Sequence, residues 1–449
     1  MKRFLLPVAA VLLMISSCTT KNYTRVVHDP ALYRESVKKL NDIILENNFP
    51  PMIASRNYAY ANIAAFEVIA AGDQENYNSL AGQIRHLTGA PKPPQDEPVD
   101  YHFAALLAFC TVGNAVTFPE GSMNEYVSNL KATAKDAGMP AAVFKSTVAY
   151  ADAVAKHVLM WSKGDNYAQT RSASKHVIKD EDGLWIPTPT MYAPALEPHW
   201  STIRPLVLDS ASQIIAALPP AFDIKDIKSP FYTGVLEVKN TGDNLTDEQK
   251  HIADFWDDNP FKMNVVGHVS FATKKFSPGG HWMNIVGIAS QKSNADFNST
   301  VAAYTQTAIA LFDGFISCWY MKYHTNYVRP ETVINKHFDP EWRPYIQTPP
   351  FPEYTSGHGV ISAAVAETLT QTFGDDFAFT DTSLREFGIA DRSFKSFREA
   401  AVEAGMSRVY GGIHYGFTAK ESYTQGMLVG QLVATRLDFR KPQPIKASR

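Results

Sequence analysis

Three short clusters in the C-terminal half of the chain combine cations, imidazoles, a hydroxyl and glycine. They are Lys322-Tyr-His-Thr-Asn-Tyr-Val-Arg329-Pro330, Ser356-Gly357-His358 and Ser407-Arg408-Val-Tyr-Gly-Gly-Ile-His414. Lysine and arginine neutralise a tetrahedral oxyanion, and a guanidinium can donate to two of its oxygens at once. The flexible backbone at Gly357 lets an amide N–H come close to such an anion. The clusters therefore predict an oxyanion-binding site.

Helices must position these side chains. Lys322 and Arg329 are seven residues apart in an expected helix over 295–328, so both should project from one face, about two turns apart. Pro330 should end that helix, because proline cannot continue it.

The other two clusters are expected at helix ends. Ser356 is typical of an N-cap, just before an apolar helical pattern over 357–373. The N–H groups and the dipole of a helix N-terminus favour an anion there. Arg408 and His414 flank a Gly-Gly turn, which would direct both side chains inward.

The order and spacing of the three clusters resemble those of the vanadium-dependent haloperoxidases, which share the pattern with acid phosphatases and type 2 phosphatidic acid phosphatases. One departure is Thr355, where the family often has proline before Ser-Gly-His. That residue shapes only the turn, so the resemblance identifies the chain as a member of this superfamily.

The resemblance implies a role for each side chain. His414 would bond the central atom, which is vanadium in a haloperoxidase and phosphorus in a phosphatase, and His358 would be the general acid or base. The residues that would hold the oxygens of vanadate, or of phosphate in the same site, are Lys322, Arg329, Ser356, Gly357 and Arg408, with Lys322 also polarising bound peroxide.

Roles near the site are assigned to five further residues, from sequence features that are less specific than the three clusters. By resemblance, Trp319 and Phe351 match the aromatic halide-site positions of the fungal chloroperoxidase type. Asp258 is either a carboxylate that pairs with an active-site arginine or histidine, or a surface residue at a helix end. His281 and His324 are interpreted as structural.

The oxyanion site leaves three functions open. A haloperoxidase would use hydrogen peroxide and halide, with vanadium acting as a Lewis acid, and the apolar wall favours iodide or bromide over chloride. A periplasmic acid phosphatase would hydrolyse a phosphomonoester through a phosphohistidine at His414. A non-catalytic oxyanion-binding lipoprotein is the third. Resemblance also in 184–206 and 255–282 favours the haloperoxidase.

Residues 1–18 are predicted to be a lipoprotein signal peptide. Lys2 and Arg3 precede an apolar run that is too short for a mature membrane helix, and Cys18 follows two serines. Cys18 would then carry a lipid anchor at a membrane, facing the periplasm or the cell surface. An ordinary secretory signal is the alternative. Free, buried thiols are expected for Cys110 and Cys318.

Composition and periodicity predict an all-α protein of two packed helical bundles, with the active site in the C-terminal one. The 449 residues are 45% hydrophobic, and the net charge of −3 gives no electrostatic case for nucleic acid. By resemblance, the N-terminal bundle is a scaffold and a surface for a homo-oligomer. The expected parts are a tether (19–30), an N-terminal bundle (31–235) with an irregular Pro/Trp-rich connector (164–206), and a catalytic bundle (236–449).

That connector has two interpretations. It is either a packed link between helical layers, or it lines the approach to the active site.

Overall fold

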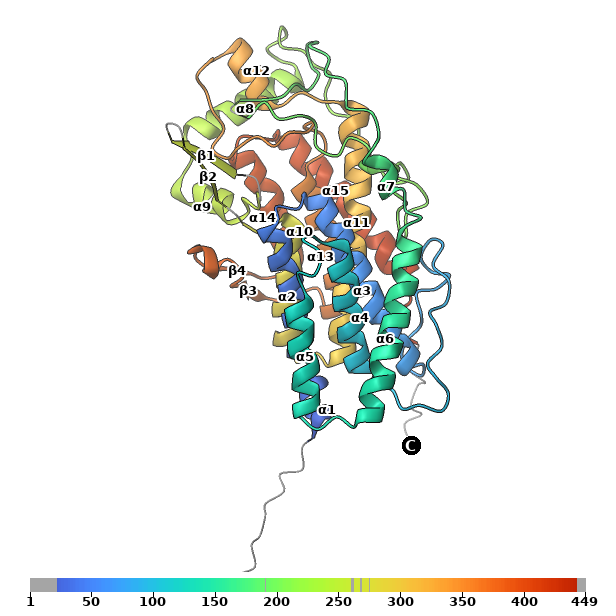
Figure 1. Cartoon of the computed structure of the whole chain (residues 1–449). Helices are drawn as coiled ribbons and strands as arrows, with labels where there is room; N and C mark the ends of the chain where they lie inside the picture. Colours follow the sequence, from blue (N-terminus) through green and yellow to red (C-terminus); the bar gives the residue numbers. More distant parts are fainter. Residues whose placement is uncertain (1–21, 190, 260–261, 267–268, 274, 442–449) are drawn as a thin grey trace, which may run out of the picture.

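A computed structural model describes residues 22–441, except 190, 260–261, 267–268 and 274. The described residues form fifteen α-helices, two one-turn 3-10 helices and two short antiparallel strand pairs (Figure 1). This confirms the all-α prediction. The expected signal peptide (1–18), including Cys18, lies outside the described residues.

The N-terminal bundle is organised around one helix that is buried on nearly all sides, α3. The preceding helix begins where local chemistry favours it, since the Asp29 side chain accepts the N–H of Ala31 and Pro30 occupies the first helical position. The helices of this bundle are α1 (Tyr23–Val27), α2 (Pro30–Glu46), α3 (Pro51–Gly72), α4 (Tyr101–Val116), α5 (Asn124–Asp136) and α6 (Ala141–Ser162).

The described part of the expected tether is structured. Helix α1 covers most of it, Val27 is buried, and His28 pairs with Asp100. A five-residue helix is too short to show a hydrophobic period, so the sequence pattern could not reveal it.

The C-terminal bundle surrounds α11, a helix about 44 Å long that packs against both α3 and α13. The expected cap at Ser356 is present, since its side chain accepts an N–H group of its own helix. Ser277 caps a helix in the same way, and Thr246 forms a capping box. The elements are α8 (Pro230–Asp243), α9 (Asp247–Phe255), β1 (Lys262–Val266), β2 (Val269–Thr273), α10 (Pro278–Lys292), α11 (Phe297–Thr325), α12 (Pro330–His337), α13 (Gly357–Phe373), β3 (Phe379–Asp381), η2 (Arg385–Phe387), β4 (Arg392–Phe394), α14 (Phe397–Tyr410) and α15 (Gly416–Arg436).

The two bundles share one continuous hydrophobic core, to which α3, α4, α11 and α13 all contribute. The predicted boundary between 235 and 236 falls inside α8, which packs against α12, α14 and α15. Helix α8 therefore groups with the C-terminal bundle. No helix in the described part of the chain is long and apolar enough to cross a membrane.

Two details of the predicted helices are wrong. Pro330 begins α12 rather than ending α11, which stops at Thr325 before the left-handed Asn326. Proline suits a first helical position, because its missing N–H has no partner to lose there. Second, the hydrophobic pattern of the sequence also predicts a helix over 381–404, but the helix begins only at Phe397, because the β3–β4 hairpin occupies the preceding residues.

The connector 164–206 is irregular, as predicted, apart from α7 (Tyr167–Thr170) and η1 (Trp200–Thr202). The chain is held at the end of this connector by Asp313, a fully buried residue of α11. Its carboxylate accepts the backbone N–H groups of Leu206, Val207 and Leu208 at 2.7–2.8 Å. Burial raises the pKa of Asp313 to about 6, while these N–H groups act to lower it.

We expect Asp313→Asn to lower the free energy of unfolding at pH 8 by about 2–4 kcal/mol. An amide offers one acceptor oxygen and turns an NH₂ toward backbone donors, which leaves buried N–H groups unpaired. Denaturant unfolding would measure the loss, with Asp152→Asn on the exposed face of α6 as the control. Equal stability of the two variants would contradict the role of Asp313.

Candidate active site

The three sequence clusters meet at one end of the C-terminal bundle. Lys322 lies in the last turn of α11, and Arg329 directly precedes α12. Ser356 caps α13, Arg408 lies in the last turn of α14, and His414 lies in the turn before α15. The ends of five helices thus bring together residues that are up to 92 positions apart in sequence.

His414 is fixed by two partners in one tautomer. Its Nδ1 lies 2.7 Å from Oε1 of Glu353, and its Nε2 lies 3.3 Å from Nη1 of Arg329. A guanidinium can only donate, so Nε2 must carry the lone pair and Nδ1 the proton. Burial, followed by Arg329 and Lys322, holds the pKa of His414 well below its usual value. A neutral imidazole can act as a ligand or a nucleophile through Nε2, whose lone pair faces Arg329 Nη1 in this structure.

Glu353 is the carboxylate at the centre of this arrangement. Besides His414, it accepts the N–H of Tyr415 and the hydroxyl of Thr418. Burial raises the pKa of Glu353 to about 7, opposed by Arg329 and Lys322. Glu353 is not among the residues predicted from the sequence. The available signal was one acid in an otherwise uncharged run over 344–357.

Lys322 is fully buried, and its ammonium donates to the carbonyls of Pro352 and Glu353 at 2.9 and 3.0 Å. These bonds use two of its three donors. Burial lowers the pKa of Lys322 to about 7. The ammonium also lies 4.8 Å from the ring centre of Phe351 and 5.6 Å from that of Trp319, within the range of a cation–π interaction.

The two arginines each keep a donor without a partner. Arg329 donates to the carbonyls of Phe351 and Ile413, but its Nη2 is buried and unpaired. Arg408 donates to the carbonyl of Trp256, and its Nε is likewise buried and unpaired. Burial lowers the pKa of both, that of Arg329 to about 10. Unpaired buried donors are rare, and here they suit an anion.

Ser356, Gly357 and His358 open α13. The hydroxyl of Ser356 accepts the N–H of Gly359, so this residue is the N-cap that the sequence predicts, while its contact with an oxyanion stays a prediction. His358 Nε2 is buried without a hydrogen-bond partner and lies 3.8 Å from Asp258 Oδ2. Burial, then Arg408, holds the pKa of His358 well below its usual value. His358 is therefore neutral.

Behind His358 lies a buried chain of Asp258, His281 and Asp381. His281 Nδ1 is 3.0 Å from Asp258 and its Nε2 is 2.8 Å from Asp381. Burial alone would lower the pKa of His281, but the two carboxylates raise it to about 10. Asp258 is thus buried and is not a surface residue. Its partner is His281, which was interpreted as structural from the sequence. His324 stacks on Tyr320 and does not line the cavity.

A cavity of about 250 Å³ opens onto this group. Asp258, Gly357, His358, Arg408 and His414 line its polar side. Lys322, Arg329 and Ser356 are fully buried and lie behind these residues. The apolar side includes Phe315, Trp319, Pro349, Pro350, Phe351 and Ile413.

The aromatic wall is formed by Trp319 and Phe351, whose ring centres are 5.1 Å apart. The connector completes it, since Met191, Ala193, Pro194 and Leu196 also line the cavity. Leu196 N–H donates to Pro350, and the Leu196 carbonyl accepts from Trp319 Nε1 and the Tyr323 hydroxyl. Of the two interpretations of 164–206, the approach to the site is therefore correct.

The donor set fits a tetrahedral oxyanion such as vanadate. Arg329 Nη2, Arg408 Nε and His358 Nε2 are buried polar atoms without partners, beside the lone pair of His414. The free Cys110 and Cys318 are both buried, as predicted, and neither lines the cavity.

Comparison with known proteins agrees with this geometry. Residues 302–440 match the family model described as the VCPO second helical-bundle domain. The structure is similar to that of the first bacterial vanadium-dependent iodoperoxidase, with a TM-score of 0.88 and 41% identity over 93% of this chain and 99% of that one. No curated protein matches the chain.

Two more distant structures share the fold. The holo form of a bacterial vanadium-dependent chloroperoxidase has a TM-score of 0.66 and 16% identity over 87% of this chain and 93% of that one. Its apo form has a TM-score of 0.63 and 16% identity, over 86% and 94%. The identity and coverage of the iodoperoxidase match show that this chain belongs to the family of vanadium-dependent haloperoxidases.

Proposed function

We propose that the protein uses bound vanadate to oxidise iodide with hydrogen peroxide. The observation that carries this is the set of buried, unpaired polar atoms on Arg329, Arg408 and His358, in the same site as Nε2 of His414. The likeness to an iodoperoxidase at 41% identity supports the choice of halide. The overall reaction is I⁻ + H₂O₂ + H⁺ → HOI + H₂O.

Different residues of the chain would bind vanadate and transfer the proton. His414 Nε2 would be the vanadium ligand, with Glu353 holding its tautomer. Lys322, Arg329, Arg408, Ser356 and the Gly357 N–H would neutralise and hold the oxygens. When bound, vanadate supplies a Lewis acid that activates peroxide without a change in its own oxidation state. His358, held neutral by burial, would accept a proton from hydrogen peroxide.

The wall of the cavity supports iodide over chloride. A large, weakly hydrated anion loses little on entering the space beside Trp319 and Phe351, whereas chloride must give up a stronger hydration shell and needs a stronger oxidant. Lys322, stacked at 4.8 Å over Phe351, would place positive charge next to the halide. Bromide is expected to be the slower substrate of the same site.

We also propose that the protein is exported as a bacterial lipoprotein, anchored through Cys18. The support is the sequence alone: Lys2 and Arg3, an apolar run, then two serines and the cysteine.

Reconstitution with orthovanadate is the direct test of function. We expect iodide oxidation by hydrogen peroxide that requires vanadate and falls at least a thousandfold in His414→Ala, because the only proposed protein–vanadium bond is lost. His324→Ala is the matched control, since His324 lies outside the cavity. Hydrolysis of a phosphomonoester by the vanadate-free protein, inhibited by vanadate and without iodide oxidation, would contradict the proposal in favour of a phosphatase.

The role of Glu353 can be tested separately. We expect Glu353→Gln to weaken vanadate binding by about 10- to 100-fold, as is typical when the partner of a ligating histidine is changed. The matched control is Glu67→Gln, a second buried glutamate, which accepts the Ser79 hydroxyl and the Leu80 N–H in the N-terminal bundle. Vanadate titration of both variants measures the difference, and equal affinities would exclude the proposed role.

A further inference from the structure

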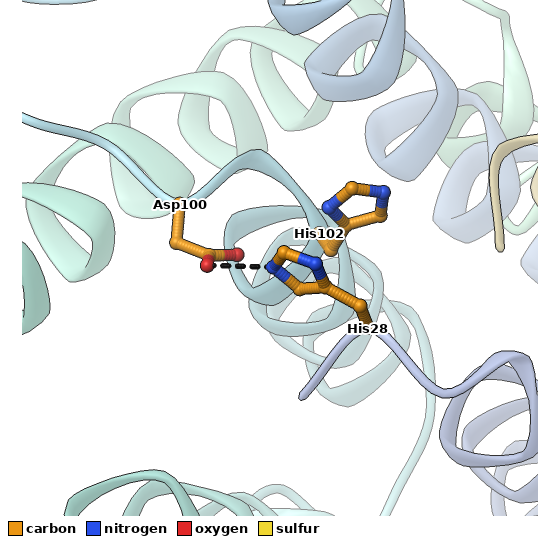
Figure 2. A group of neighbouring side chains, drawn as sticks. All are labelled: His28, Asp100 and His102. Carbon is orange, nitrogen blue, oxygen red and sulfur yellow. Dashed lines mark hydrogen bonds and ion pairs between the residues drawn. The ribbon is translucent and has the colours of Figure 1, made fainter. Parts of the chain in front are cut away.

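A second group of metal-ligating side chains lies far from the active site, in the N-terminal bundle. His28 follows α1, and Asp100 and His102 stand at the start of α4 (Figure 2). One ligand atom of each residue lies within 4.8 Å of the others. Figure 2 shows the His28 ring facing the Asp100 carboxylate, with the His102 ring beside it. Two imidazoles and one carboxylate form a donor set that Zn²⁺ prefers.

The electrostatics of the group favour a cation. Asp73, Asp100 and Asp296 all act on His102, while no lysine or arginine is among the described residues that line this cavity. The start of α4 contributes about half a positive charge at its N-terminus, which three carboxylates outweigh. The ring centres of His28 and His102 are 4.0 Å apart, so two protonated imidazoles would repel each other there.

A cavity and an unpaired acceptor atom beside the three side chains also support a metal site. A cavity of about 200 Å³ is lined by the three residues together with Asp73 and Asn298. The Oδ1 atom of Asn298 is buried and has no hydrogen-bond partner, although its amide nitrogen donates to Asp73. Such an oxygen would accept a hydrogen bond from a water in the fourth position of a tetrahedral ion.

Binding requires the three side chains to adjust, because their ligand atoms lie up to 4.8 Å apart and must come closer to the separation in a tetrahedral ion. His28 Nε2 and Asp100 Oδ2 are 2.8 Å apart, joined by a hydrogen bond. Tetrahedral Zn²⁺ with ligands at about 2.0–2.1 Å separates neighbouring ligand atoms by about 3.3 Å. The pair must therefore open by about 0.5 Å, which the 35% exposed side chain of His28 permits.

We propose that His28, Asp100 and His102 bind one Zn²⁺ ion, with a water as its fourth ligand. The ion would join the end of α1 to the start of α4. It would therefore hold the first described segment of the chain onto the N-terminal bundle, independently of vanadate and of the oxidation of halide.

Isothermal titration of the tag-free, chelator-treated protein with ZnCl₂ tests this inference. We expect one Zn²⁺ per chain, at least tenfold weaker binding in His28→Ala and in His102→Ala, and no binding in the double variant. His157→Ala, a partly exposed helical histidine that binds a backbone carbonyl, is the matched control and should bind as the wild type does. No stoichiometric binding, or binding that survives in the double variant, would overturn the proposal.

Two further measurements distinguish the loss of a zinc ligand from misfolding of a variant. Asp100→Asn retains a good helix cap while removing the charge, so weakened binding with an unchanged melting temperature of the metal-free protein isolates the ligand role. Anomalous diffraction from Zn²⁺-soaked crystals of the wild type locates the ion directly. A zinc peak between the three side chains supports the site, and a peak elsewhere refutes it.

Discussion

The cost of burying three cations in one place governs the rest of this structure. Lys322, Arg329 and Arg408 are almost completely buried, and an unpaired buried charge costs several kcal/mol. The fold offsets this with backbone carbonyls, with Glu353 near Lys322 and Arg329, and with Asp257 and Asp258 near Arg408. Two guanidinium donors nevertheless stay unpaired. An oxyanion would accept from these donors, in agreement with the proposed vanadate site.

Much of the site could be predicted because its side chains are tied to helix ends, and helix ends have strong local signals. Ser356 shows both its cap and its motif in the sequence, and the structure places it at the first turn of α13. Lys322 was predicted on the helix that carries it. The fold class followed from hydrophobic periodicity, which depends on the same local physics.

What could not be predicted depends on contacts distant in sequence. Glu353 acquires its role only when the turn before α15 brings His414 to it, 61 residues later. His281 is held by Asp258 and by Asp381, the latter 100 residues away on a hairpin that looked helical. The position of Pro330 could not be predicted for a local reason. Proline is common both at the start of a helix and just after the end of one, so the sequence alone does not distinguish the two.

The connector (164–206) is the part of the cavity wall whose side chains can change most easily. The backbone of Leu196 bonds to Pro350 and Trp319 of the cavity wall and to Tyr323, and any residue at that position except proline could make these hydrogen bonds. The side chains around it are therefore free to change while the wall keeps its place. None of the cations that face the oxyanion belongs to this segment. Substitutions in the connector can thus alter which molecules reach the oxidant while the chemistry that produces it stays intact.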